Sequence, residues 1–232
     1  MQLFFGSVIE GSTVFLDGDE ARHCKVLRKQ EGDEISVIDG KGLLLRSRIL
    51  KTGRDKVEAE ILESVLQPRT RDYYFHLLIA PTKQNERMEW MLEKAVEIGL
   101  DEITFIETEH SEKHRLNIGR LEKIAISAIK QSLQYYLPVI NPLTSLKQVG
   151  FDENTFIAHC IPEEQKSSLV SACNQIPPHS KISILIGPEG DFSGQEVAYC
   201  LDMGARAIQL GANRLRTETA GLYCAAILSG LA

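Results

Sequence analysis

The pattern of apolar and polar positions divides the 232-residue chain into two parts. In the first part, short apolar stretches alternate with turn signals such as Asp-Gly, Gly-Asp and Thr-Gly, which is typical of strands joined by tight turns. Only ARHCKVLRK (21–29) has the pattern of a short helical turn. In LRSRIL (45–50) apolar and basic residues alternate, so Arg46 and Arg48 should share one exposed strand face. We predict a small β-barrel-like domain over residues 1–70.

A polar linker, QPRTRD (67–72), precedes a region in which continuous apolar runs alternate with helical patterns. The predicted strands are 73–80, 102–108, 155–160, 181–187 and 205–211. The predicted helices are 85–99, 120–138, 163–176, 193–204 and a final apolar helix that is capped by Thr217 or Thr219. Strands that alternate with helices of this length predict a parallel sheet covered on both faces. Residues 73–232 are therefore expected to form an α/β domain.

Composition is that of a globular protein, since 43% of the residues are hydrophobic and 25% are charged. The apolar stretch TAGLYCAAILSGLA (219–232) is shorter than the roughly 20 residues that a membrane span requires. The first residues lack the basic leader and apolar core of a signal peptide, so we expect a cytoplasmic protein without a membrane partner. Five scattered cysteines without a Cys-x-x-Cys pair predict buried thiols, with no disulfide framework and no metal site.

Charge is unevenly distributed along the chain. The net charge is −6, yet residues 1–71 carry 12 basic and 12 acidic side chains and are neutral. Within this part, two groups of basic residues stand out: Lys41, Arg46, Arg48, Lys51, Arg54 and Lys56, and then Arg22, His23, Lys25, Arg28 and Lys29. Local basic surface of this kind can hold phosphates although the whole chain is acidic. A solvated strand face explains the charge equally well.

Three of the predicted parallel strands end in segments that could carry chemistry, because ligands of such sheets bind beyond the carboxyl ends of the strands. In ILIGPEGDFSGQE (184–196), Pro188 and Gly190 enforce a tight turn, and Ser193 with Glu196 fits a capping box for the next helix. Neither a G-x-G-x-x-G pattern nor a Walker loop is present. When this segment is taken alone, a well-capped turn is the favoured interpretation.

In IQLGANRLRTETAGLY (208–223), two arginines and a glutamate open the last helix. Glu218 is favourable near a helix N-terminus, whereas Arg216 opposes the helix dipole. A bound anion or a paired carboxylate would explain Arg216. The third strand end, FIAHC (156–160), carries His159, for which a satisfied core histidine is the alternative to a ligand contact or a general base.

GPEGDFSGQE followed by LGANRLRTETA resembles the RsmE family of RNA methyltransferases, which belong to the SPOUT superfamily. The resemblance extends along the whole chain, on His23, Val26, Leu27 and Arg28, and then on Lys83, Lys94, Glu97 and Gly99. Four positions depart from the family pattern. Lys130 and Gln134 stand where Glu and Arg are usual, His110 replaces Arg, and Asp191 replaces a frequent third Gly.

The resemblance implies an α/β SPOUT domain with a deep trefoil knot, a PUA-like β-barrel module, and S-adenosylmethionine as cofactor. Connectivity rules alone would have excluded a knot. The residues that the resemblance assigns to the cofactor are His159, Ile186, Gly187, Pro188, Glu189, Gly190, Leu210, Gly211, Leu215, Arg216 and Thr217. Main-chain groups would read the adenine edge, Leu210 and Leu215 would pack on its faces, and the glycines would leave room for the ligand.

The reaction that the resemblance implies is methylation of N3 of a uridine, position 1498 in the usual numbering of 16S rRNA, in the small ribosomal subunit. The N3 proton must leave, so a carboxylate is needed, and Glu218 or Glu189 is the candidate, with a slight preference for Glu218. Arg216 would hold a uracil oxygen or a phosphate. An Arg216–Glu218 ion pair at a dimer interface is the structural alternative. Family members are generally homodimers.

The expected RNA-binding residues are His23, Arg28, Arg46, Arg48, Lys51 and Lys83. Phosphate contacts from such residues position RNA without reading its sequence. Three alternatives stay open: a ribosome-assembly factor that binds RNA without catalysis, a methyltransferase with another target such as tRNA or a ribose 2′-hydroxyl, and a nucleotide-binding hydrolase. The last lacks a phosphate loop.

Overall fold

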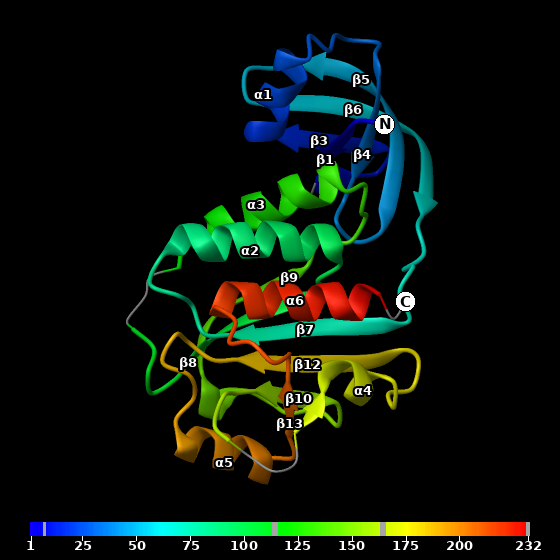
Figure 1. The fold of residues 1–232 in the computed structure, drawn as a ribbon. Helices are drawn as coiled ribbons and strands as arrows, with labels where there is room; N and C mark the ends of the chain where they lie inside the picture. The colour runs from blue at the N-terminus through cyan, green and yellow to red at the C-terminus, as the bar shows by residue number, and fades with distance from the viewer. Residues whose placement is uncertain (7, 113–115, 163–165, 231–232) are drawn as a thin grey trace. The chain divides into compact units, whose positions relative to one another are not determined.

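The computed structural model describes residues 1–6, 8–112, 116–162 and 166–230. It divides into two compact units (Figure 1). Unit 1 comprises Met1–Thr70 and Ile126–Leu137, and unit 2 comprises Arg71–Ala125 and Pro138–Ala232. Among the described residues, no helix is both long and apolar enough to span a membrane.

Unit 1 is built on a six-stranded sheet whose order is β1-β4-β5-β6-β3-β2. Its strands are β1 (Leu3–Phe5), β2 (Val8–Glu10), β3 (Thr13–Asp17), β4 (Glu34–Ile38), β5 (Leu43–Thr52) and β6 (Lys56–Leu66). The β1–β4 pair is parallel and the other neighbours are antiparallel. Helix α1 (Asp19–Val26) buries Ala21 and Cys24 in the core that these strands enclose. The predicted all-β module with one helical turn is confirmed, including the exposure of Arg46 and Arg48 on one face of β5.

The second half of α3 (Ile118–Gln131) and the residues that follow it belong to unit 1. The predicted helix 120–138 ends earlier, and Leu133 just beyond it has a left-handed φ of 56°. Such a backbone conformation is unfavourable for leucine and incompatible with a continuing helix. Tyr136 then donates its hydroxyl to the carbonyl oxygen of Gln67 at 2.8 Å. The segment thus joins the β-sheet module although it is distant in sequence.

Lys130, one of the departures from the family pattern, lies in this segment and forms an ion pair with Glu20 of α1. Both side chains are largely buried, and the second carboxylate oxygen of Glu20 accepts a hydrogen bond from the Phe5 amide at 3.0 Å. Removing one partner of a buried pair leaves an uncompensated charge, so the pair fastens α3 to unit 1. Lys130 therefore has a structural explanation that does not involve RNA.

Unit 2 contains a seven-stranded parallel sheet in the order β11-β13-β10-β12-β7-β8-β9. The strands are β7 (Tyr73–Ile79), β8 (Glu102–Glu107), β9 (Val139–Ser145), β10 (Thr155–Ala158), β11 (Ser167–Ser168), β12 (Ser180–Ile186) and β13 (Arg206–Gln209). The helices are α2 (Asn85–Ile98), α4 (Leu169–Cys173), α5 (Gly194–Asp202) and α6 (Thr217–Ser229), with a 3-10 turn at Leu146–Gln148. The predicted α/β class and parallel sheet are confirmed.

Helices cover both faces of this sheet (Figure 1). Helices α2 and α6 pack together on one face, where Gly221 approaches Ile79, Leu77 and Met91 so closely that an added Cβ would lie 3.0 Å from Ile79. On the opposite face, Val197 and Cys200 of α5 pack against Leu78 and Leu185. The core is therefore continuous through the central strands, which explains their uninterrupted apolar sequences.

Besides α3, two further regions differ from the prediction. Strand β9 was not predicted, because Pro142 interrupts its pattern; a proline is tolerated there since β9 is the edge strand of the sheet. The predicted helix 163–176 is represented by the short α4, preceded by β11, whereas residues 163–165 lie outside the described part of the chain. Ser168 caps α4 by accepting a hydrogen bond from the Ser171 amide.

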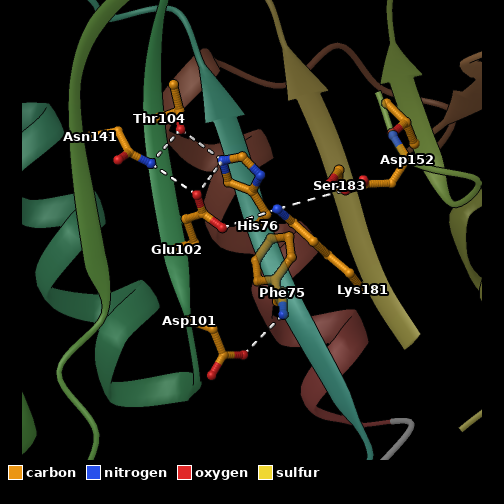
Figure 2. Close-up of polar contacts among 10 residues, drawn as sticks. Phe75, His76, Asp101, Glu102, Thr104, Asn141, Asp152, Lys181 and Ser183 are labelled. Carbon is orange, nitrogen blue, oxygen red and sulfur yellow. Dashed lines mark hydrogen bonds and ion pairs between the residues drawn. The ribbon is translucent and has the colours of Figure 1, made fainter. Parts of the chain in front are cut away.

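A polar cluster interrupts the apolar sheet near the beginning of its central strands (Figure 2). His76 Nε2 on β7 lies 2.8 Å from the Thr104 hydroxyl and 3.6 Å from Glu102 Oε1. Asn141 donates to both of these partners at 2.9 Å, and Lys181 on β12 lies 3.2 Å from Glu102 Oε2. Either the Thr104 hydroxyl donates to an unprotonated Nε2 or a protonated Nε2 donates to the hydroxyl oxygen, depending on the tautomer of the histidine.

Burial lowers the pKa of His76 from 6.5 to about 4, against the opposing charge of Glu102. The unfolded chain therefore binds a proton on this histidine between about pH 6.5 and 4, while the folded chain does not. We expect the free energy of unfolding to fall on acidification through this window, by up to about 1.4 kcal/mol per pH unit. Urea unfolding at a series of pH values measures the slope. In His76→Gln, which keeps an amide beside Thr104 but cannot titrate, the slope should be smaller; an unchanged slope would assign the pH dependence to other groups.

Candidate active site

A cavity of about 570 Å³ lies at the carboxyl ends of three neighbouring parallel strands, β13, β10 and β12. Its walls come from three segments: 158–160 at the end of β10, 186–191 except Gly190 at the end of β12, and 208–217 from the end of β13 to the start of α6. Lys166 and Ala220 complete the lining. The cavity is where the topology predicts a ligand site, since the three strands end at one edge of the sheet.

Most of the residues that the sequence assigned to a cofactor meet in this cavity. The residues that line it are His159, Ile186, Gly187, Pro188, Glu189, Leu210, Gly211, Leu215, Arg216 and Thr217. Gly190 differs: it is not part of the lining, and a Cβ built on it would lie 3.0 Å from Cβ of His110. The segments separated by up to about sixty residues in sequence are thus brought together by the order of the strands.

Gly187, Gly190 and Gly211 differ in the structural reason for which each position lacks a side chain. A Cβ at Gly187 would lie 3.1 Å from the ring and the amide of Phe192, and one at Gly190 would press on His110. Both contacts are with the chain itself, so at these two positions the protein alone favours glycine. At Gly211 an added Cβ would meet no atom within 4 Å. Gly211 is therefore the glycine whose missing side chain leaves accessible backbone in the cavity.

Hydrogen bonds join the segment before α6 to the turn after β12. Thr217 donates its hydroxyl to the carbonyl oxygen of Gly187 at 2.9 Å, and Arg214 donates from Nη2 to the carbonyl oxygen of Glu189 at 3.1 Å. Thr217 was predicted as a possible helix cap, but the N-cap position belongs to Arg216, whose side chain makes no capping bond. The hydroxyl of Thr217 instead joins the start of α6 to the turn after β12 through its bond to Gly187. The predicted capping box of Ser193 and Glu196 is confirmed at α5.

The two residues that the sequence grouped as a catalytic pair are separated. Arg216 is exposed and lines the cavity, whereas Glu218 is 7% exposed and lies outside the lining. The Oε1 atom of Glu218 lies 3.5 Å from Nη1 of Arg87 on α2. The paired carboxylate that was considered for Arg216 therefore has its ion pair with Arg87. Glu189 is exposed and belongs to the cavity lining.

Several residues of the cavity were not predicted from sequence. Lys166 donates to the carbonyl oxygens of His159 and Ile161, at 2.7 and 2.5 Å, and so fixes the backbone after β10. Asp191 lines the cavity and contacts Cys160. The prediction of buried thiols is wrong for Cys160, which is exposed and lines the cavity, while Cys24, Cys173, Cys200 and Cys224 are buried. These contacts link separate segments, so no local pattern in the sequence could predict them.

The predicted RNA-binding residues lie on both units. On unit 1, Arg46 lies 3.5 Å from Glu34 and 3.3 Å from Glu63, and Arg48 lies 3.6 Å from Glu34. Three further residues of that prediction lie on unit 1. The ring of His23 packs against Phe4. Lys51 and Arg28 are exposed, and Arg28 has a φ of 55°. On unit 2, Lys83 lies 3.4 Å from Glu112. The acidic neighbours reduce the positive potential around Arg46 and Arg48. Among the described residues, no group of three or more potential metal ligands is assembled.

Comparison with known proteins agrees with this arrangement. A family model described as an RNA methyltransferase domain matches residues 70–229, and one described as an RNA methyltransferase PUA domain matches residues 16–62. Ribosomal RNA small subunit methyltransferase E of Buchnera aphidicola is 31% identical over 216 residues, which cover 88% of this chain and 83% of that protein.

Two solved structures share the fold over nearly the whole chain. A probable rRNA-methyltransferase from Porphyromonas gingivalis is 40% identical with a TM-score of 0.88, covering 97% of this chain and 95% of its own. Ribosomal RNA small subunit methyltransferase E from Neisseria gonorrhoeae, in a structure bound to S-adenosyl methionine, is 28% identical with a TM-score of 0.83, covering 100% and 98%. The resemblance found in the sequence is thereby confirmed, and the chain belongs to the RNA methyltransferase family that includes ribosomal RNA small subunit methyltransferase E.

Proposed function

We propose that the protein transfers a methyl group from S-adenosylmethionine to N3 of a uridine in 16S rRNA of the small ribosomal subunit. The observation that carries this proposal is the cavity in which the IGPEG and LGANRLRT segments meet, with Arg216 exposed in its lining. The family, and the names of relatives that match nearly the whole chain, support rRNA as the substrate class.

The residues of the cavity suit this cofactor. Exposed backbone at Gly211 can accept a flat ring, because no side chain of the protein occupies the space above it. Leu210 and Leu215, both half-buried in the lining, would pack on the two faces of the adenine. The relative from Neisseria gonorrhoeae with the same fold is bound to S-adenosyl methionine. When bound, the cofactor supplies an electrophilic methyl group.

The reaction requires that the N3 proton of uracil leave and that the negative charge on the base be stabilised. Glu189 is the better placed proton acceptor, because it lines the cavity, whereas Glu218 is directed to Arg87. Arg216 would bind a uracil oxygen and stabilise the developing anion. N3 of uracil faces the pairing edge, so the nucleotide must be unpaired or flipped before it enters the site. Glu218 then serves to connect α6 to α2.

The wider architecture follows the same proposal. Residues 1–70 form the PUA-like RNA-binding domain and residues 73–232 the methyltransferase domain, with the exposed Arg28 and Lys51 as phosphate contacts. A trefoil knot in the second domain rests on the family resemblance alone. A homodimer is supported by the exposed Trp90 and Tyr223 on the neighbouring helices α2 and α6.

Methyl transfer to small subunits should depend on Arg216. With labelled S-adenosylmethionine, we expect 3-methyluridine on unmodified small subunits and less or none on free 16S rRNA or tRNA, identified by nucleoside mass spectrometry. Arg216→Ala should reduce the rate by at least about 100-fold, as expected for loss of one group that stabilises transition-state charge. Cofactor binding without transfer to any RNA would favour an assembly factor. A methylated ribose, or a methylated tRNA, would show that the target is not N3 of a uridine in 16S rRNA.

Gly211 gives a test of the cofactor site that avoids damage to the fold. In Gly211→Val, Cβ would have no protein atom within 4 Å apart from its chain neighbours, so the melting temperature should change little. The affinity for S-adenosylmethionine in calorimetry should fall at least about tenfold, because the valine side chain fills the space beside the Gly211 backbone in which the cofactor would lie. Gly150→Val is the matched control, since Gly150 also has no atom within 4 Å of a built Cβ and lies outside the cavity lining. If Gly211→Val and Gly150→Val bind S-adenosylmethionine with equal affinity, the cofactor does not bind in this cavity.

A further inference from the structure

Asp191 has a backbone conformation that would favour glycine. Its φ is 63°, in the left-handed region, and its amide donates to the carbonyl oxygen of Pro188 at 2.9 Å to close the turn after β12. Aspartate tolerates this region better than most residues, but glycine adopts it without steric cost. The side chain must therefore make contacts that outweigh the conformational disadvantage.

The carboxylate of Asp191 bonds to two separate parts of the chain. Oδ2 accepts a hydrogen bond from the amide of Cys160 at 2.7 Å, and Oδ1 accepts one from the amide of Phe192 at 2.8 Å. Cys160 follows β10, while Phe192 leads into α5. Hydrogen bonds to an ionised acceptor are stronger than neutral ones. The bond to Cys160 joins two walls of the cavity, and the bond to Phe192 fixes the carboxylate within its own turn.

The backbone of the same residue reaches a third segment. The carbonyl oxygen of Asp191 lies 3.0 Å from Nδ1 of His110, which follows β8. A neighbouring bond runs in parallel, from the amide of Glu109 to Oε1 of Glu196 at 2.7 Å. The turn after β12 is therefore fastened on one side to the residues after β10 and on the other to the residues after β8. His110 and Asp191, both departures from the family pattern, contact each other.

We infer that Asp191 is a positioning residue of the cofactor cavity, which fixes the spacing between the segment after β10 and the turn after β12. This inference rests on the proposed function, since it concerns the same cavity. Asp191 lines the cavity beside Cys160, so loss of its carboxylate releases the Cys160 amide and lets the two walls separate. The effect falls on binding rather than on the methyl-transfer step.

The variant Asp191→Gly tests the carboxylate alone, because glycine keeps the left-handed conformation. We expect the dissociation constant for S-adenosylmethionine in calorimetry to rise at least about tenfold. The melting temperature should be unchanged or slightly lower, because the lost hydrogen bonds of the carboxylate outweigh the relief of the left-handed backbone. In methyl transfer, KM for the cofactor should rise while kcat at saturation stays close to that of the unmodified protein. Asp191→Asn, which can accept only through one oxygen, should lie between the two.

His179→Gly is the matched control. His179 also has a left-handed φ, of 62°, in an exposed turn between α4 and β12, and it does not line the cavity. Replacing it by glycine makes the same kind of backbone change, and the affinity for S-adenosylmethionine should stay as it is. A loss of affinity in this control as large as that in Asp191→Gly would show that backbone flexibility, not the carboxylate, is responsible, and would overturn the inference.

The thiol of Cys160 supplies a readout that does not need the cofactor. Burial raises the pKa of Cys160, and the negative charge of Asp191 raises it further. Asp191→Gly should therefore increase the fraction of thiolate and the rate at which iodoacetamide alkylates Cys160 at pH 8, measured by peptide mass spectrometry. The other four cysteines are buried and serve as internal references.

The outcomes separate the two proposals. If the unmodified protein does not bind S-adenosylmethionine, the proposed function fails, whatever the variant does. If the unmodified protein binds and Asp191→Gly binds with the same dissociation constant, the inference about Asp191 fails while the function stands. Should Asp191→Gly not fold, Asp191→Asn decides: undiminished affinity together with unchanged alkylation of Cys160 overturns the inference.

Discussion

Three neighbouring parallel strands, β13, β10 and β12, end at one edge of the sheet, and the rest of the site depends on how the chain leaves them. Each strand end exposes main-chain groups that its own strand no longer pairs, and these groups need partners. Lys166 provides them after β10, Thr217 and Arg214 provide them after β12, and Asp191 joins the two segments. The cavity is the space that these bonds hold open.

Local sequence patterns were sufficient for the elements whose stability is local. Helix α2 ends at Gly99 and α5 begins with a capping box, and both signals are contained within a few residues. The apolar runs of β7 and β12 likewise identify buried parallel strands. Where the chain depends on distant contacts, the pattern failed: α3 stops at Gln131, and β9 forms despite Pro142 because its outer edge needs no partner.

The segments of the candidate site that contain glycine or proline turn signals were predictable from the sequence. The segments around Gly187 and Gly211 stand out in the sequence, and the structure brings both to the cavity. The pairing of side chains was not predictable, because partners come from different strand ends. Glu218 was grouped with Arg216, two residues away, yet its ion pair is with Arg87, 131 residues away in sequence. Only the packing of α6 on α2 decides between them.

Departures from the family pattern also become interpretable through their contacts. Lys130 binds Glu20 inside unit 1, and His110 contacts Asp191 beside the cavity. Lys130, His110 and Asp191 thus each have a partner within their own unit, so these three departures have a structural explanation.

The most direct test of the central claim is hydrogen exchange of the full chain with and without S-adenosylmethionine, followed by mass spectrometry of peptides. If the cavity at the ends of β10, β12 and β13 holds the cofactor, the amides of residues 158–161, 187–192 and 209–217 should become protected together, while those of β5 in unit 1 should not change. Protection confined to other segments, or no change in these three, would contradict the account.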